Sequence, residues 1–182
     1  MSRGISTSTG ALALALVLHL IQPTGGVAQA EPLQLSFIGP TLQLVDDDAD
    51  VRGVRLSLLY GVNENVTGLD VGLVSHARGH VKGVQLGLVG VTDGMFTGWQ
   101  DAVVNVAREG HRGLQLGFVN ITGEGDGIQW GGVYNGAERL EGLQVALVNF
   151  AEDLHGIQVG IVNIIQAKER LSVLPLVNWK FD

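Results

Sequence analysis

Large apolar residues alternate with small or polar residues along short segments of this chain, and the alternation returns at a fixed interval from residue 53 onward. Eight units each open with a glycine, at Gly53, Gly68, Gly83, Gly98, Gly113, Gly127, Gly142 and Gly156. Successive glycines are 15, 15, 15, 15, 14, 15 and 14 residues apart. Self-similarity at a fixed period indicates an array in which each unit covers the apolar face of its neighbours.

Each unit repeats the same residue types when its glycine is numbered as position 1. Position 5 is always Gly, Ala or Ser, which predicts that another part of the chain passes close by. Position 7 is Leu59 in the first unit and valine in the other seven. Position 3 is glutamine in six units, Gln85, Gln100, Gln115, Gln129, Gln144 and Gln158, and position 8 is asparagine in four, Asn105, Asn120, Asn149 and Asn163.

The apolar residues fall mainly at positions 2, 4 and 6, as in Leu114, Leu116 and Phe118. Alternation with period two predicts a half-buried strand. Positions 7 and 9 are also mostly apolar, so we expect a bend near position 8 that returns both sets to one core, supplied by positions 2, 4, 6, 7 and 9. Five units also keep one apolar residue two places before the next glycine: Val66, Val81, Phe96, Leu140 and Leu154.

Two all-β architectures fit eight such units. In a parallel β-solenoid, residues at the same position stack about 4.8 Å apart, so that Gln lies on Gln and Asn on Asn. In a small up-and-down β-barrel, neighbouring strands run in opposite directions, so equivalent positions do not face one another and identical residues there do not stabilise the pairing. The near-constant connection length and an aromatic content of 5% favour the solenoid over a membrane barrel, which pairs short with long connections between aromatic girdles.

The chain divides into four segments on this interpretation. Residues 1–30 form a secretory signal peptide, because a basic Arg3, an apolar run over 11–21 and a small-x-small signal at 28–30 follow in order. Residues 31–52 form an N-terminal cap, residues 53–170 the eight-unit array of 14–15-residue rungs, and residues 171–182 a C-terminal cap strand. The apolar run is too short to span a bilayer.

Charge and composition narrow the function. The whole chain has 11 Lys and Arg against 18 Asp and Glu, and residues 1–30 contain one basic and no acidic residue. The remainder therefore has 10 basic and 18 acidic residues, a formal charge of −8. Such a surface disfavours nucleic acid, whose binding needs clustered Lys and Arg. The chain contains no cysteine, so no disulfide stabilises it.

The units GLQLGFVN at 113–120, GLQVALVN at 142–149 and GIQVGIVN at 156–163, with the closing LPLVNWKF at 174–181, resemble a family of bacterial exported surface-repeat proteins built from GLQLGLVN-type units. The resemblance covers about residues 53–181. It implies an exported protein of the cell envelope, located in the periplasm, the outer membrane or at the cell surface, with no catalytic residues to transfer. The segments at 98–101 and 131–134 depart from the pattern.

Candidate chemical sites are few. The acidic segment 46–50 offers carboxylate oxygens to Ca²⁺ but lacks the spacing and the glycine of a calcium loop, so we interpret it as a solvated turn. His76 and His80 lie in what we expect to be a connector and lack a third ligand, which favours exposed loop histidines over a metal site. His111 and His155 share a position but are three units apart, too far to share a metal.

The motifs of known catalytic and phosphate-binding sites are absent from the sequence. The glutamines at position 3 are expected to bond one another along a structural ladder, as are the asparagines at position 8; the alternative is an outward stripe that binds a ligand. We therefore expect a non-enzymatic exported protein without cofactor or metal, with a structural or interaction role at the envelope. A small outer-membrane β-barrel protein is the alternative. Envelope components, a second copy of the chain and a membrane remain open as partners.

Overall fold

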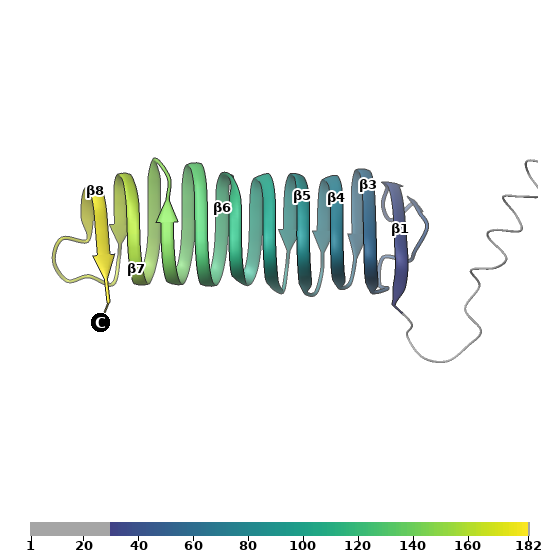
Figure 1. The fold of residues 1–182 in the computed structure, drawn as a ribbon, viewed down its shortest axis with the longest axis horizontal. Helices are drawn as coiled ribbons and strands as arrows, with labels where there is room; N and C mark the ends of the chain where they lie inside the picture. Colours follow the sequence, from purple (N-terminus) through teal and green to yellow (C-terminus); the bar gives the residue numbers. More distant parts are fainter. Residues whose placement is uncertain (1–29, 182) are drawn as a thin grey trace, which may run out of the picture.

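The computed structural model describes residues 30–181, which form one straight coil (Figure 1). Arg3 and the apolar run of the predicted signal peptide lie outside the described residues. The strands are β1 (Glu31–Ile38), β2 (Leu42–Gln43), β3 (Val51–Asn63), β4 (Val66–Ala77), β5 (Val81–Thr92), β6 (Met95–Val145), β7 (Val148–Ile165) and β8 (Val173–Lys180). They belong to one sheet in the order β2-β1-β3-β4-β5-β6-β7-β8.

Successive units pair in parallel and in the register of the repeat. Gly53 is opposite Gly68, Gly68 is opposite Gly83, and Gly83 is opposite Gly98. The same holds near the other end, where Gln144 is opposite Gln158. The predicted β-solenoid is therefore confirmed, with about seven turns, and the antiparallel arrangement of successive units is wrong.

The two ends of the coil are built differently. At the N-terminal end β1 pairs in parallel with β3, with Gln34 opposite Arg55, so it continues the coil, while the short β2 lies antiparallel against β1. At the C-terminal end β8 lies antiparallel against β7, with Asn178 opposite Gln158. This last strand contains Pro175, which has no backbone N–H to offer.

The glycine that opens each unit is required by geometry. All eight have φ between 119° and 155°, a region that residues with side chains rarely adopt. A Cβ at Gly68 would also collide with the carbonyl oxygen of Gly53, and the same contact recurs one coil later between Gly83 and Gly68. Position 1 therefore sets how closely the coils stack.

The interior is lined by the polar and small positions and not by the large apolar ones. The glutamines at position 3 and the asparagines at position 8 are completely buried or nearly so. Position 6 points outward, with Leu88 50% exposed, Phe118 60% and Ile161 64%. Positions 6 and 7 both face out, which turns the chain at that corner and leaves position 8 facing in. The expectation that positions 2, 4, 6, 7 and 9 form the core is wrong, because a single coil is too narrow for two facing rows of leucine.

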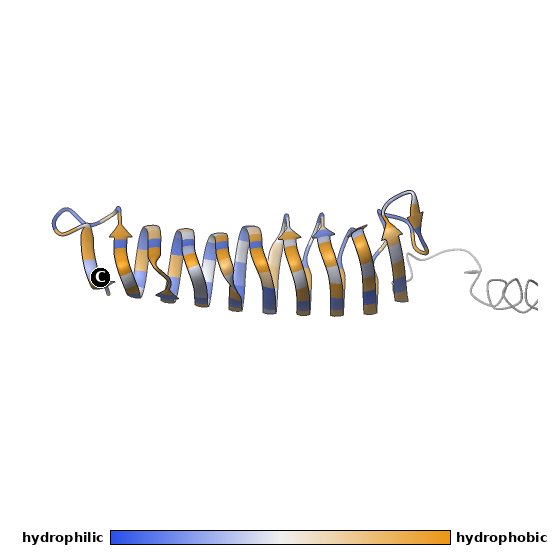
Figure 2. Ribbon diagram, turned by 90° about the horizontal axis from the view of Figure 1, so that it is seen from above, coloured by the Kyte–Doolittle hydropathy of each residue, from blue (hydrophilic) through white to orange (hydrophobic). Residues whose placement is uncertain are grey.

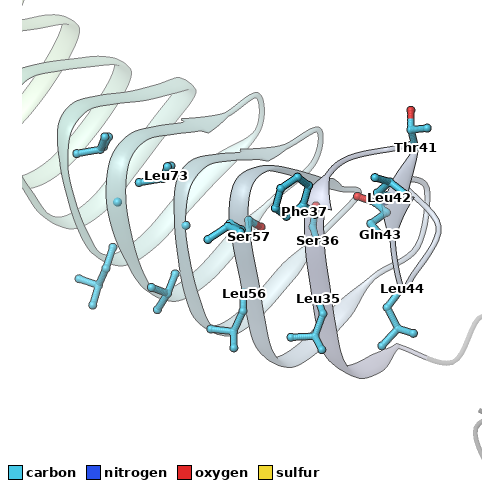
Figure 3. Close-up of a pocket in the computed structure, with 16 residues that line it drawn as sticks. Leu35, Ser36, Phe37, Thr41, Leu42, Gln43, Leu44, Leu56, Ser57 and Leu73 are labelled. Carbon is cyan, nitrogen blue, oxygen red and sulfur yellow. The ribbon is translucent and has the colours of Figure 1, made fainter. Parts of the chain in front are cut away.

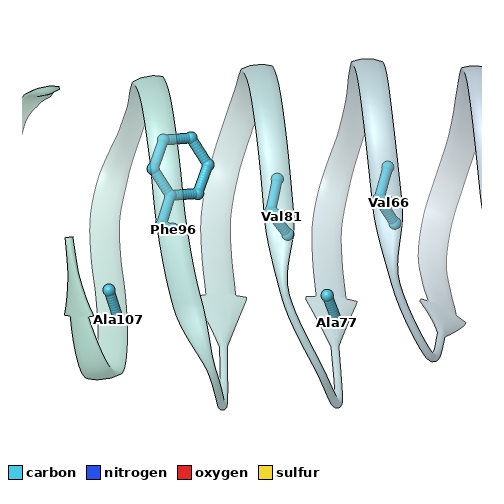
Figure 4. Close-up of a cluster of buried hydrophobic side chains, with 5 residues drawn as sticks. All are labelled: Val66, Ala77, Val81, Phe96 and Ala107. Carbon is cyan, nitrogen blue, oxygen red and sulfur yellow. The ribbon is translucent and has the colours of Figure 1, made fainter. Parts of the chain in front are cut away.

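A smaller apolar core occupies the other side of the interior. Figure 4 shows one cluster, in which Val66, Val81 and Phe96 belong to successive coils and lie near Ala77 and Ala107. A second cluster contains Leu140 and Leu154 with Ala137, Ala151 and Ile165. The large members of both clusters, apart from Ile165, are the residues two places before a glycine, so these positions supply the apolar core.

Two coils contain an extra residue at the corner that the sequence register did not show. Tyr60, and not Leu59, is opposite Val74, and Tyr134, and not Val133, is opposite Val148. The extra residue shifts Asn135 into line with Asn149. Asn135 therefore belongs to the asparagine column, although counting from Gly127 places it at position 9.

Replacement of Gly117 by leucine should destabilise the fold. A Cβ at Gly117 would collide with the carbonyl oxygen of Ala102 and approach the amide of Asn105. We expect a loss of about 3 kcal/mol in the free energy of unfolding, since overpacking of this kind forces the coils apart. Phe118→Leu, at the neighbouring outward residue, is the control and should change stability by less than about 1 kcal/mol. Equal stability of both variants in chemical denaturation would contradict a close approach at position 5.

Candidate functional site

The glutamines at position 3 form a continuous chain of side-chain hydrogen bonds inside the coil, which we call the glutamine ladder. From Gln100 onward, the Nε2 of each glutamine donates to the Oε1 of the glutamine one coil earlier, at 2.7–2.9 Å. The members are Gln85, Gln100, Gln115, Gln129, Gln144 and Gln158. Gln100 and Gln129 keep the ladder continuous through the two segments that depart from the repeat pattern. Because all six are buried, they do not form an outward stripe for a ligand.

A buried ion pair begins the glutamine ladder. Asp70 and Arg55 stand at position 3 in the two coils before Gln85, and both side chains are fully buried. Arg55 donates to both carboxylate oxygens of Asp70, at 2.8 and 2.7 Å. Asp70 also accepts from Ser75 and from Gln85 Nε2. A carboxylate only accepts hydrogen bonds, so Asp70 obliges Gln85 to present its N–H₂ and thereby orients every later amide.

The asparagines form a second ladder with the opposite direction. From Asn105 to Asn149, each Nδ2 donates to the Oδ1 of the asparagine one coil later, at 2.8–2.9 Å. The members are Asn105, Asn120, Asn135, Asn149 and Asn163. Buried polar groups are costly unless they are bonded, and here the repeat itself supplies the partners. The interior of the coil is thus occupied by groups that stabilise it, and interactions with other molecules fall to the outside.

The outside of the coil is largely apolar. Figure 2 shows hydrophobic bands that recur in successive coils and so line up along the rod. In β1, β3, β4 and β5 two rows flank a groove of about 1100 Å³. Figure 3 shows Leu35 and Leu56 in one row and Phe37 and Leu73 in the other. The rows consist of Leu35, Leu56, Val71 and Leu86, and of Phe37, Leu58, Leu73 and Leu88, with Leu42 and Leu44 at the β2 end.

Charged residues are confined to one edge of the coil, formed by the connectors between the position-10 residue of one unit and the next glycine. Ion pairs link adjacent coils there, as between Arg139 and Glu124 at 2.7 Å and between Arg112 and Asp126 at 3.3 Å. Between residues 53 and 165 three charged residues lie elsewhere: Arg55 and Asp70 are buried, and Asp101 interrupts the row of Leu35 to Leu86. Apart from Asp101, the charged edge and the apolar faces are therefore separate between residues 53 and 165.

The histidine pair predicted for one connector is divided in the structure. His76 lies in β4 and not in a connector, and it is half-buried. Its Nδ1 is 3.1 Å from the hydroxyl of Tyr60, and its Nε2 is 3.0 Å from a carboxylate oxygen of Asp93. His80 does lie in the connector, where its Nδ1 accepts from the backbone N–H of Met95. The two rings thus have separate partners and do not form a common site.

His111 and His155 do not share a structural position. His155 is exposed and is opposite Glu141, because the unit that contains it has 14 residues and the register shifts by one within it. His111 is buried, and neither ring nitrogen has a hydrogen-bond partner in the protein. Burial lowers the pKa of His111 to about 4, against a smaller opposing effect of the charge on Asp126. His111 is therefore neutral at pH 7 and belongs to the interior.

The acidic segment 46–50 serves as a turn that packs against the first coils. The Asp46 carbonyl accepts from Asn63, the Asp50 carboxylate accepts from Asn65, and Asp47 pairs with Arg78 at 2.6 Å. Within residues 30–181 no group of three His, Asp or Glu side chains is arranged to hold a metal ion. In the same part of the chain, no helix has the length and hydrophobicity to cross a membrane.

Breaking the ion pair from one side should be costly, and replacing both residues should not. Asp70→Gln leaves the Arg55 charge buried without its partner, and we expect a loss of about 3–5 kcal/mol in the free energy of unfolding. The double variant Arg55→Gln/Asp70→Gln extends the glutamine ladder by two members and should lie within about 1 kcal/mol of the original chain. Urea denaturation of both variants measures the two changes in the free energy of unfolding. A double variant as unstable as the single one would show that an amide cannot replace the ion pair.

Stability should fall in weak acid because of His111. The unfolded state takes up a proton near the ordinary pKa of 6.5 and the folded state only near 4, so acid favours unfolding between these values. The expected loss from pH 7 to pH 4 is about 3 kcal/mol. His111→Leu, which places in that column the residue found at 140 and 154, should remove this part of the pH dependence. His155→Leu, on the surface, is the control, and an equal effect of both changes would assign the acid sensitivity elsewhere.

Comparisons with protein-family models, curated proteins and solved structures found no match to this chain. The resemblance of its units to the GLQLGLVN-type repeats therefore remains an expectation from the sequence. Its most distinctive feature is the arrangement of a hydrogen-bonded polar interior, apolar faces and one charged edge.

Proposed function

We propose that this chain is an exported, non-enzymatic repeat protein of the bacterial cell envelope, with a structural or interaction role. One observation carries the proposal: the polar groups that repeat most regularly are buried and bonded to one another, whereas the surface is a rod with apolar faces. Repeat proteins commonly bind through extended faces made of equivalent positions. A large exposed apolar surface marks an interaction site.

The part of the structure most similar to a catalytic arrangement supports a structural role. Tyr60, His76 and Asp93 are bonded in sequence across three coils, and Asp93 also pairs with Arg108. Both ring nitrogens of His76 are occupied within this chain of contacts. None of the three residues lines the apolar groove, so they are not aimed at a space where a substrate would lie. The network fastens neighbouring coils together.

Export is supported by the order of signals at the N-terminus. The basic Arg3, the apolar run and the small residues Ala28 and Ala30 place the expected cleavage directly before Glu31, where β1 begins. Removal of residues 1–30 would thus leave every coil intact. The absence of cysteine is compatible with an oxidising compartment, because stacking replaces disulfides as the source of stability.

Fractionation of cells tests this proposal. The full chain with a C-terminal tag, produced in a Gram-negative host, should be recovered with the envelope and should begin at Glu31 by mass spectrometry. Ala30→Leu should retain the uncleaved form, since the residue before the cleavage point must be small. Ala49→Leu, a similar change in the acidic turn, is the control and should be processed normally. Full-length protein in the cytoplasm would contradict export.

A further inference from the structure

We propose that the apolar outside of the coil seats against the acyl chains of a lipid layer, with the charged edge left in water. This inference rests on the proposed envelope role and names its partner. It begins from the inverted distribution of polarity: amide ladders lie inside, while leucine, valine, isoleucine and phenylalanine lie outside. Proteins that face hydrocarbon with strands have the same arrangement, apolar outward and polar inward.

The backbone of the coil meets the main requirement of a hydrocarbon environment. A lipid layer offers no hydrogen bonds, so each backbone N–H and C=O facing it must be bonded within the protein. In this coil the strands pair continuously with the coil before and the coil after, from β1 to β8. The sides of the rod therefore present side chains alone, and unpaired strand edges lie at its two ends.

The position of the charges selects one orientation. The connectors carry the ion pairs, whereas the row along one face is interrupted by a single carboxylate, Asp101, next to Leu86. With the faces against lipid, the connectors point away from it. Between residues 53 and 165 no lysine or arginine lies on the faces, so attachment would depend on apolar contact and not on anionic headgroups.

Two of the three tryptophans lie where a lipid surface would meet water, and the third, Trp130, stands at position 4 within the apolar row. Trp99 stands at position 2, directly beyond the opening glycine and the charged edge, and Trp179 is opposite Ile157, which is also at position 2. Both indole side chains are about half exposed, at 43% and 53%. Tryptophan is enriched at membrane interfaces because its ring is apolar and its N–H is polar.

A lipid layer accounts for the surface better than a second copy of the chain. A symmetric dimer covers one patch on each subunit. Here the exposed apolar residues form two rows, with Leu56 at position 4 and Leu88 and Phe118 at position 6, and the second row continues along the rod to Ile161. A fluid layer of acyl chains can cover both rows along the length of the rod, and its chains fit the groove of about 1100 Å³ between them.

Flotation with phosphatidylcholine vesicles tests the proposal. The chain from Glu31 to Asp182 is used, because the apolar run of the signal peptide would itself bind lipid; residues 30–181 contain all the described coils. We expect it to float with the vesicles equally at about 50 mM and about 500 mM NaCl, as apolar contact is not screened by salt. Leu88→Asp/Phe118→Asp should weaken binding at least about tenfold. Thr67→Asp/Thr97→Asp adds the same charge on the connector edge and should bind normally.

Tryptophan fluorescence locates the contact. Brominated acyl chains should quench the emission of Trp99, Trp130 and Trp179 in the original chain and in the connector variant, and less in Leu88→Asp/Phe118→Asp. Circular dichroism of each variant checks that the strands are retained. Failure of the folded original chain to float, while it still fractionates with the envelope, would overturn the lipid contact and leave the envelope role standing. Dimerisation without flotation, abolished by Leu88→Asp/Phe118→Asp, would assign the faces to a second copy instead.

Discussion

The stacking of identical amides inside the coil is the interaction on which the rest of the structure depends. Each glutamine from Gln100 to Gln144 both donates and accepts along the axis, so one of these coils is satisfied only when its neighbours present the same residue at the same height. This requirement fixes the register, and the register in turn aligns the opening glycines and the apolar core. The outward residues take no part in the amide hydrogen bonds that fix the register. They can therefore be apolar without disturbing the fold.

The column structure of the repeat was predictable, and the side of the sheet that faces inward was not. Residue identity at positions 3 and 8 indicates parallel stacking, because identical side chains bond to one another only when equivalent positions of successive units stack. Alternation of large apolar and polar residues, as in Leu114, Gln115 and Leu116, is however equally compatible with the apolar set or the polar set facing the interior. Analogy with ordinary strands predicts that the apolar set forms the core. The narrow cross-section of the coil reverses that assignment, since Gln115 is buried and Phe118 is exposed.

The extra corner residue and the buried ion pair are difficult to recognise from the sequence, because the residues around them resemble the regular repeat. Val133 fits the valine column, so the extra residue before Tyr134 leaves no gap in the sequence register, and the sequence alone does not assign Asn135 to the asparagine column. Arg55 and Asp70 looked like exceptions to the glutamine column. Their opposite charges at one position in adjacent units were the signal of a buried ion pair. The direction of the glutamine ladder depends on the Asp70 carboxylate at its first end, which a pattern of residue types does not express.

The antiparallel closing strand limits the length of the rod. A coil whose last edge repeated the parallel register would offer the next chain a template for addition, and successive additions would produce a fibre. β8 reverses direction against β7, places Asn178 opposite the last glutamine, and removes one donor from the final edge at Pro175. An incoming first coil would meet neither the register nor the amide column it needs. A fibre that grows by continued parallel stacking is therefore disfavoured at this end of the described coils.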